Sequence, residues 1–173
     1  MKRPGMLVLG LLIGGCATMS YLRPDATAEL KNAQGVVVGF ATLSEEQGGV
    51  RVFADVRGLP PGPHGTHLHA VGKCEPPDFT SAGGHFNPAG KKHGLGNPDG
   101  SHAGDLPNIA VGADGTGQLN YLARGVTLGS GAGSLFGADG TAVVIHAGPD
   151  DYWTDPAGNS GARIACGVIK KAS

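Results

Sequence analysis

The sequence has few aromatic residues, little net charge and no long apolar run. Aromatic side chains make up 5% of its 173 residues, and the formal net charge at pH 7 is -1. No basic patch is present to bind phosphates, so nucleic-acid binding is not expected. The N-terminal apolar run, residues 6–13, is far short of the roughly 20 residues that cross a bilayer, so a retained transmembrane helix is the weaker interpretation.

The N-terminus has the order of residues that is typical of an export signal. Lys2 and Arg3 precede the apolar run, and small residues follow it. We therefore predict a signal peptide over residues 1–15 and a tether over residues 16–26, followed by a single domain over residues 27–173.

The letters IGGC resemble the lipobox of bacterial lipoproteins, in which cleavage leaves a lipid-bearing cysteine as the first mature residue. This resemblance implies lipidation at Cys16 and a location on the periplasmic side of a bacterial membrane. Ala17, rather than an aspartate, follows Cys16, which favours the outer membrane. An ordinary cleavage site further along the chain is the alternative.

The three cysteines are an odd number, but Cys74 and Cys166 remain as an even pair if Cys16 carries lipid. An exported protein meets a compartment that permits disulfides, so we predict a disulfide between Cys74 and Cys166. Two buried free thiols are the alternative.

Short segments rich in β-branched residues, often alternating apolar and polar, predict an all-β domain. Eight such segments occur, at residues 27–32, 36–45, 50–59, 65–71, 108–113, 117–123, 141–147 and 162–169. Glycine-containing turns with the letters NAQG, EEQGG and ADGTG join several of them as hairpins. No helix-length apolar pattern is found, so we expect an eight-stranded antiparallel sandwich or flattened barrel.

Two long segments lack a strand pattern, at about residues 72–107 and 147–161. Loops of this length in a compact domain are usually functional or disordered. We interpret the first as functional because of the side chains that it carries, which are His85, His93, His102 and Asp105.

Histidines give the strongest functional signal. His67 and His69 are two residues apart on an expected strand, so their rings project from one face while Leu68 enters the core. Solvent-facing or packed histidines are the alternative for such a pair. His146 and His85 favour a metal site instead, because several buried imidazoles need a partner for every nitrogen lone pair.

A second group of candidate ligands lies on the first long loop and consists of His85, His93, His102 and Asp105. Three nitrogens and one carboxylate complete a four-coordinate zinc ion with no open position, which is the pattern of a structural site. The other group is rich in imidazole and suits copper. Its members are His67, His69, His85 and His146. His85 stands in both groups, and spacing cannot show whether its ring is shared.

Six motifs along residues 27–171 resemble, in order, the copper/zinc superoxide dismutases in their exported bacterial form. They are GPHGTHLH, SAGGHFNP, KKHG, HAGDLPN, VVIHAGPDD and GNSGARIACGVI. The resemblance implies an eight-stranded Greek-key barrel, an immunoglobulin-like sandwich. It also implies a copper ion on the imidazole-rich group and a zinc ion on the other group, with the ring of His85 shared between the two metals.

The resemblance assigns roles to two residues that are not ligands. Asp150 would accept hydrogen bonds from His67 and His93 and so orient both rings. A loop aspartate that caps its own turn is the alternative. Arg163 would hold a positive charge beside copper for an incoming anion. A plain surface arginine is the alternative for this position.

The resemblance also matches Cys74 and Cys166 to the family's disulfide. That bond would join the segment of Arg163 to the loop that follows His69. His64 matches a structural position, so we expect a packing residue there and not a ligand.

The reaction implied by the resemblance is the dismutation of two superoxide anions to dioxygen and hydrogen peroxide by a copper ion that changes oxidation state. Arg163 would hold the anion, and His85 would take up a proton that helps to form peroxide. Without residues 1–15 the chain has 11 basic and 14 acidic residues, so attraction of an anion needs local positive charge. The segment AGPDDYWTDPAGNSG has no lysine. The remaining candidates for steering are Lys73, Lys91 and Lys92.

Three other functions are weaker interpretations. A copper or zinc carrier needs easy metal release, and a structural domain of the same family would have lost copper ligands, whereas none is missing here. A zinc hydrolase needs an open zinc position and a general base, and neither is evident. We therefore expect an antioxidant enzyme of the cell envelope, a monomer or homodimer that meets the membrane only through its lipid.

Overall fold

The computed structural model describes residues 23–173. The predicted signal peptide, the predicted lipidation site Cys16 and most of the predicted tether lie outside the described residues. Within the described range, no helix has the length and apolar character needed to cross a bilayer. The helical structure in that range is a single 3-10 turn, η1 (Thr80–Ala82), so the expected all-β fold is confirmed.

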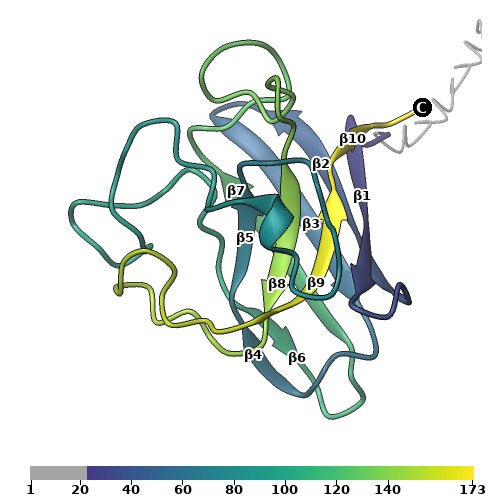
Figure 1. The fold of residues 1–173 in the computed structure, drawn as a ribbon. Helices are drawn as coiled ribbons and strands as arrows, with labels where there is room; N and C mark the ends of the chain where they lie inside the picture. The colour runs from purple at the N-terminus through teal and green to yellow at the C-terminus, as the bar shows by residue number, and fades with distance from the viewer. Residues whose placement is uncertain (1–22) are drawn as a thin grey trace, which may run out of the picture.

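Antiparallel strands form one sheet that curls into a nearly closed barrel (Figure 1). The ten strands are β1 (Ala26–Asn32), β2 (Val37–Glu46), β3 (Gly49–Val56), β4 (Gly62–His64), β5 (Thr66–His69), β6 (Ile109–Val111), β7 (Gly117–Ala123), β8 (Ala142–His146), β9 (Arg163–Val168) and β10 (Lys170–Lys171). All eight expected strands are present, and β4 and β10 are additional. β4 has the sequence GPH and β10 the sequence KK, and neither shows the alternation of apolar and polar residues that predicts a strand.

The predicted glycine turns form the hairpins. Gly35, Gly48 and Gly115 have φ angles of 77°, 91° and 78°, a region that residues with a Cβ rarely occupy. The order across the sheet is β4-β6-β7-β3-β2-β1-β9-β8-β5, so the connection from β3 to β4 crosses β7 and β6. Strands that follow each other in the chain but are not neighbours in the sheet give the expected Greek-key connectivity.

Gly65 lies where the barrel closes. It separates β4 from β5, which stand at opposite ends of the sheet order, and its carbonyl accepts the N–H of His146 at 2.8 Å. The strand predicted over residues 65–71 is β5, which is shorter than expected and ends at His69. The chain changes partner at Gly65, with His64 in β4 and residues 66–69 in β5.

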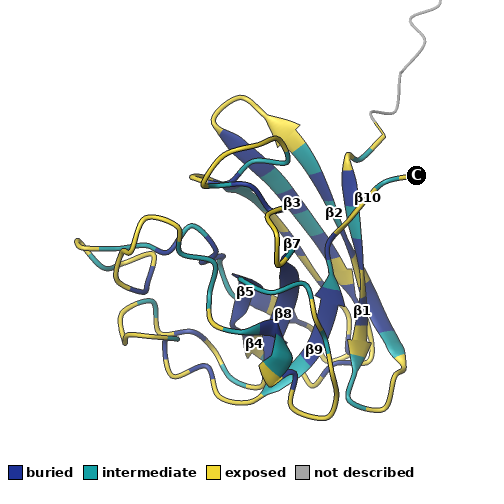
Figure 2. Ribbon diagram, turned by 45° about the horizontal axis from the view of Figure 1, so that its top comes forward, coloured by how far each residue is buried: buried dark blue, intermediate teal, exposed yellow. Residues whose placement is uncertain are grey.

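Aliphatic side chains that alternate along the strands fill the interior. Leu30, Leu43 and Ile145 are fully buried in this main core. A smaller cluster joins Phe79, in the first long loop, to Val144 on the other face of β8. Figure 2 shows that β5 and β8 are buried along their whole length. Both faces of these two strands are therefore removed from water, one by the core and the other by loops.

The two expected long loops lie on the same side of the barrel, away from the C-terminus (Figure 1). They connect β5 to β6 and β8 to β9, and they touch where Gly96 N–H donates to the Tyr152 carbonyl at 3.2 Å. A third loop, residues 124–141, connects β7 to β8 and was not predicted as a long loop. Its Leu135 is fully buried, so this loop contributes a side chain to the main core.

Candidate metal centre

The first long loop returns to the free edge of β5. One edge of β5 pairs with β8, and on the other edge Leu68 N–H donates to the Gly104 carbonyl at 2.8 Å. A Cβ on Gly104 would overlap the Leu68 carbonyl oxygen, so this approach requires glycine. Isolated bridges along the same edge form two pairs, His69 with His85 and His67 with Asp105. Backbone pairing thus brings distant side chains beside His67 and His69.

Four buried histidine nitrogens converge, and none has a hydrogen-bond partner within residues 23–173. They are His67 Nδ1, His69 Nε2, His85 Nε2 and His146 Nε2. The four side chains offer ligand atoms that all lie within 4.8 Å of one another. Each buried polar atom without a partner costs about 1–3 kcal/mol, so four together indicate a group that binds them all. A cation fits, because a neutral imidazole nitrogen is a metal ligand.

The opposite nitrogens of three of these rings are held by acceptors. The pairs are His67 Nε2 with Asp150 Oδ2 at 2.8 Å, His69 Nδ1 with the Gly83 carbonyl at 2.8 Å, and His146 Nδ1 with the Gly161 carbonyl at 3.0 Å. Each acceptor places the hydrogen on the far nitrogen and leaves a lone pair on the near one. The surrounding chain therefore sets the tautomer of each ring in the form that binds metal.

The second group converges on one carboxylate oxygen. Asp105 Oδ1 lies 2.9 Å from His85 Nδ1, 3.1 Å from His93 Nδ1 and 3.3 Å from His102 Nδ1. Its Oδ2 accepts the backbone N–H groups of Gly94 and His102 at 2.8 and 3.0 Å. Three imidazole nitrogens around one anionic oxygen form a donor set that fits four-coordinate zinc. His85 contributes Nε2 to the first group and Nδ1 to the second.

Burial keeps histidines of the first group neutral. It lowers the pKa of His67 to about 3, of His69 to about 2 and of His146 to about 4. A neutral imidazole retains the lone pair that a metal needs. These side chains therefore stay available as ligands well below neutral pH.

In the second group burial lowers the pKa of His102 as well, but the surroundings of His93 have the opposite electrostatic character. Burial opposes the ionisation of Asp105 and Asp150, but hydrogen bonds from histidines outweigh it and lower the pKa of both carboxyl groups. Burial also opposes charge on His93, yet hydrogen bonds to these two carboxylates raise its pKa to about 9. Two buried carboxylates thus favour a positive charge between them, which a divalent cation supplies.

Asp150 joins the two groups from behind. Its Oδ2 accepts the Nε2–H of His67 at 2.8 Å, and its Oδ1 accepts the Nε2–H of His93 at 2.9 Å. Asn108 holds the backbone of Asp150 on both sides. Asn108 Oδ1 accepts the N–H of Asp150 at 2.8 Å, and Asn108 Nδ2 donates to the carbonyl of Asp150 at 2.9 Å. The Tyr152 hydroxyl in turn accepts the N–H of Asn108 at 2.8 Å. The bridging carboxylate is therefore held firmly in one orientation.

Arg163, at the start of β9, reaches back to the first long loop. Its Nη1 donates to the Phe79 carbonyl at 2.6 Å and its Nη2 to the Gly83 carbonyl at 2.7 Å. The same Gly83 oxygen accepts His69 Nδ1, so the guanidinium lies beside the first group. Burial is the largest cause of the lowered pKa of His69 and His146, and the positive charge of Arg163 is a smaller cause.

The lysines considered for steering differ in their surroundings. Lys92 Nζ is 3.0 Å from Asp155 Oδ2, and this ion pair offsets its charge. Lys73 and Lys91 are exposed. Lys92 is therefore the weakest of the three candidates for attracting an anion.

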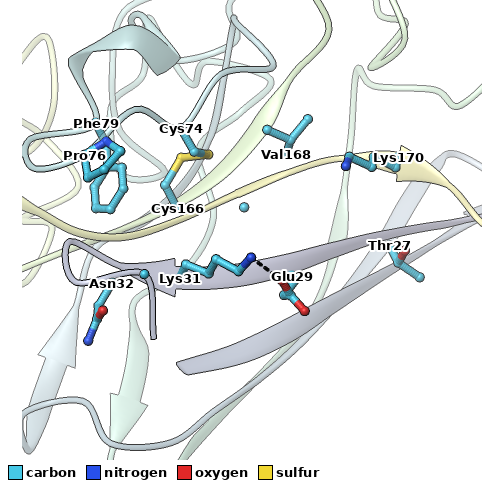
Figure 3. A pocket seen from close by; sticks show the side chains of 12 residues that line it. Thr27, Glu29, Lys31, Asn32, Cys74, Pro76, Phe79, Cys166, Val168 and Lys170 are labelled. Carbon is cyan, nitrogen blue, oxygen red and sulfur yellow. Dashed lines mark ion pairs between the residues drawn. A yellow bond between two sulfur atoms is a disulfide. The ribbon is translucent and has the colours of Figure 1, made fainter. Parts of the chain in front are cut away.

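The structure contains the disulfide predicted between Cys74 and Cys166 (Figure 3). It ties the first long loop to β9, three residues after Arg163. A surface pocket of about 320 Å³ borders the disulfide, and none of the candidate metal ligands lines it. This pocket is therefore separate from the histidine groups.

His64 is buried and belongs to neither group. Its Nδ1 is 2.8 Å from the His146 carbonyl oxygen, and its Nε2 is 2.7 Å from the Pro60 carbonyl oxygen. Both ring nitrogens face backbone carbonyl oxygens, which agrees with a packing role and turns neither nitrogen toward the other histidines.

Sequence reasoning missed three residues that surround the groups, namely Asn108, Tyr152 and Asp155. Each acts through a ligand's backbone or through Asp150; Asp155 Oδ1, for example, accepts the backbone N–H of His93 at 2.9 Å. Their residue types are common in loops and carry no spacing rule. The only available signal was the presence of Tyr152 and Asp155 in the same loop as Asp150.

The chain matches known proteins over most of its length. The family model described as copper/zinc superoxide dismutase (SODC) matches residues 37–169. A protein of Aquifex aeolicus (strain VF5), named "Superoxide dismutase (Cu-Zn) 2", is 50% identical over 171 residues, which are 98% of this chain and 99% of that protein.

Solved structures have the same fold. A SOD-like protein from Bacillus subtilis gives a TM-score of 0.79 at 43% identity and covers 82% of this chain and 96% of its own. The Cu/Zn superoxide dismutase from Brucella abortus gives a TM-score of 0.67 at 30% identity, over 84% of this chain and 99% of that one. The expected Greek-key barrel is thus confirmed. The chain belongs to the copper/zinc superoxide dismutase family and is an oxidoreductase whose cofactors are copper and zinc.

Proposed function

We propose that this protein is a superoxide dismutase of the bacterial cell envelope that converts two superoxide anions to dioxygen and hydrogen peroxide. The observation that carries the proposal is the convergence of four buried nitrogens, without hydrogen-bond partners in the described part of the chain, beside a second group that shares His85. Neither a lone structural zinc site nor a carrier needs two adjacent ligand groups joined by one ring.

We assign the two metals to the two groups. Copper would be held by His67, His69, His85 and His146, and zinc by His85, His93, His102 and Asp105. An all-imidazole set suits copper, and three imidazoles with a carboxylate suit structural zinc. When bound, copper supplies the one-electron redox chemistry. Asp150 orients a ring in each group through its hydrogen bonds to His67 and His93.

We assign catalytic roles to His85 and Arg163. His85 Nδ1 belongs to the zinc group, so Nε2, at any time when it is not a ligand of copper, is the atom at which this ring can hold a proton for peroxide formation. Arg163 carries a positive charge for the incoming anion. Both of its acceptors, the carbonyls of Phe79 and Gly83, are uncharged, so they fix the guanidinium without neutralising it.

We propose that the protein is exported and attached to a membrane by lipid. The disulfide fits an oxidising compartment, and the export signal over residues 1–15 fits the same location. Cys16 is then the lipidated first residue, residues 16–26 are the tether, and residues 27–173 are the catalytic domain. Mass spectrometry of the N-terminal peptide tests this directly. A peptide that begins after Cys16 without lipid contradicts the anchor.

The function is tested by purifying the mature protein, measuring copper and zinc per chain, and following superoxide loss by pulse radiolysis with and without cyanide. We expect both metals and a cyanide-sensitive activity. His146→Gln is the matched variant, because it removes a ligand of copper alone and should abolish activity while zinc is retained. A protein that binds zinc but has no copper-dependent activity would instead be a structural member of the family.

A further inference from the structure

In almost every proposed histidine ligand, the ring nitrogen that is turned away from the metal position has a partner of its own. His67 and His93 donate to Asp150, His69 and His146 donate to carbonyls, and His85 uses both nitrogens for the two groups. His102 differs from these five. Its Nδ1 faces Asp105, and its Nε2 has no hydrogen bond within residues 23–173. A carboxylate oxygen, Asp155 Oδ1, lies 4.0 Å from that Nε2.

The same carboxylate holds a second zinc-group histidine. Asp155 Oδ1 accepts the backbone N–H of His93 at 2.9 Å, and Oδ2 pairs with Lys92 Nζ at 3.0 Å. Asp155 lies on the loop between β8 and β9, whereas Lys92, His93 and His102 lie on the loop between β5 and β6. Asp155, on the second long loop, therefore contacts the proposed zinc ligands, which lie on the first long loop.

We propose that Asp155 is a positioning residue for zinc, which clamps the backbone of His93 and supplies the outer negative charge for the ring of His102. A histidine that binds metal through one nitrogen becomes a stronger donor at the other, and a carboxylate there strengthens the metal bond. At 4.0 Å the contact is completed by a small movement or by one bridging water. This inference rests on the assignment of zinc in the proposed function.

Lys92 provides a matched control. Its ion pair with Asp155 is exposed, with 62% and 40% of the two side chains accessible, so it contributes little by itself. Lys92→Gln removes this partner of Asp155 and leaves the contacts with His93 and His102 in place. Asp155→Asn keeps an oxygen for the His93 N–H but loses the negative charge, and Asp155→Ala loses both.

The experiment measures zinc affinity by chelator competition on protein loaded with zinc alone, so that superoxide turnover does not enter. We expect Asp155→Asn to weaken zinc binding about tenfold, which is the lower end of the losses seen when a hydrogen-bond partner of a metal ligand is removed. Asp155→Ala should weaken zinc binding further. Lys92→Gln should stay within about twofold of the unmodified chain. Cobalt in the zinc position reports ligand geometry through its visible absorption, and its bands should change in Asp155→Asn and not in Lys92→Gln.

Unchanged zinc affinity and cobalt bands in Asp155→Asn would overturn the inference. An equal loss in Lys92→Gln would also overturn it, because the effect would then belong to the ion pair between the loops. If Asp155→Asn does not fold, Asp155→Glu, which keeps the charge, must bind zinc more tightly than Asp155→Ala, or the inference fails. An unmodified chain that binds no zinc would overturn the zinc assignment itself, which distinguishes the two failures.

Discussion

His69 and Arg163 donate hydrogen bonds to the same atom, the Gly83 carbonyl oxygen, at 2.8 and 2.7 Å. A ring of the copper group and the charge proposed to attract superoxide are thus positioned by one backbone oxygen. The Cys74–Cys166 disulfide ties the loop that carries Gly83 to the strand that carries Arg163. The place of this charge relative to the copper group is therefore built into the fold.

Arg163→Ala should slow superoxide turnover by more than about tenfold at low salt, because it removes the fixed charge that attracts the anion. Arg163→Lys keeps the charge but cannot hold both carbonyls with one planar group, so an intermediate rate is expected. Pulse radiolysis at several salt concentrations measures these rates, with copper content as the control. An unchanged rate in fully loaded Arg163→Ala would refute the role.

Asn108→Ala should weaken zinc binding although Asn108 touches no proposed ligand. The expected loss is up to about tenfold, because Asp150 is no longer held on both sides of its backbone. Asp150→Asn should lose at least as much zinc affinity. The variant with both substitutions should lose less affinity than the sum of the two single losses, because both substitutions act through one carboxylate. Chelator competition measures all three. Asn120→Ala, on the exposed outer face of β7, is the control, and equal affinity in Asn108→Ala and this control rules the idea out.

Removing the disulfide should lower the free energy of unfolding by about 4 to 5 kcal/mol, because it frees a long loop in the unfolded chain. The bonded cysteines are 92 residues apart. Urea unfolding of a Cys74→Ser, Cys166→Ser variant after metal removal measures the change. A loss below about 1 kcal/mol would mean that the bond only positions the loop.

Acidification should destabilise the protein once its metals have been removed. His67, His69 and His146 have folded pKa values of about 3, 2 and 4, below the ordinary value of 6.5. As the pH falls through 6.5, the unfolded chain binds protons that the folded chain does not. Stability that is complete above pH 6.5 is therefore lost at up to about 1.4 kcal/mol per pH unit for each ring.

The remaining groups do not reverse this direction between pH 6.5 and 5.5. His93, with its pKa raised to about 9, contributes stability that is complete below pH 6.5 and is lost as the pH rises toward 9. Above about pH 7 this ring makes acidification stabilising, and below pH 6.5 it is one ring against three. The lowered pKa values of Asp105 and Asp150 matter only below the ordinary range of a carboxyl group. Urea unfolding at several pH values measures the slope, and a free energy that is constant or rises toward pH 5.5 contradicts the assignment of neutral rings.

The sequence predicted the strands that have readable turns and alternation. β1, β2 and β3 alternate along seven to ten residues and are joined by glycine turns, so local chemistry was sufficient. The break at Gly65 could not be predicted, because it depends on which strands meet when the barrel closes. The third loop, residues 124–141, was given no role, because the burial of its Val126 and Leu135 in the core depends on the folded barrel and not on a local pattern.

For the site, residue types and their positions brought forward both groups of candidate ligands, and the resemblance to a family supplied the sharing of His85 and the roles of Asp150 and Arg163. Which nitrogen of each ring faces inward could not be predicted, because it depends on acceptors such as the Gly161 carbonyl that only the fold brings close. Asn108 and Asp155 were missed for the same reason. Their contacts are formed between loops that lie far apart in the chain.

The most direct test of the shared ring is anomalous X-ray diffraction at the copper and zinc absorption edges on crystals of the metal-loaded protein. The account predicts a copper peak at His85 Nε2 and a zinc peak at His85 Nδ1, with the two ions on opposite sides of one imidazole. A single ion beside His85, or the same element on both sides in fully active protein, would contradict it.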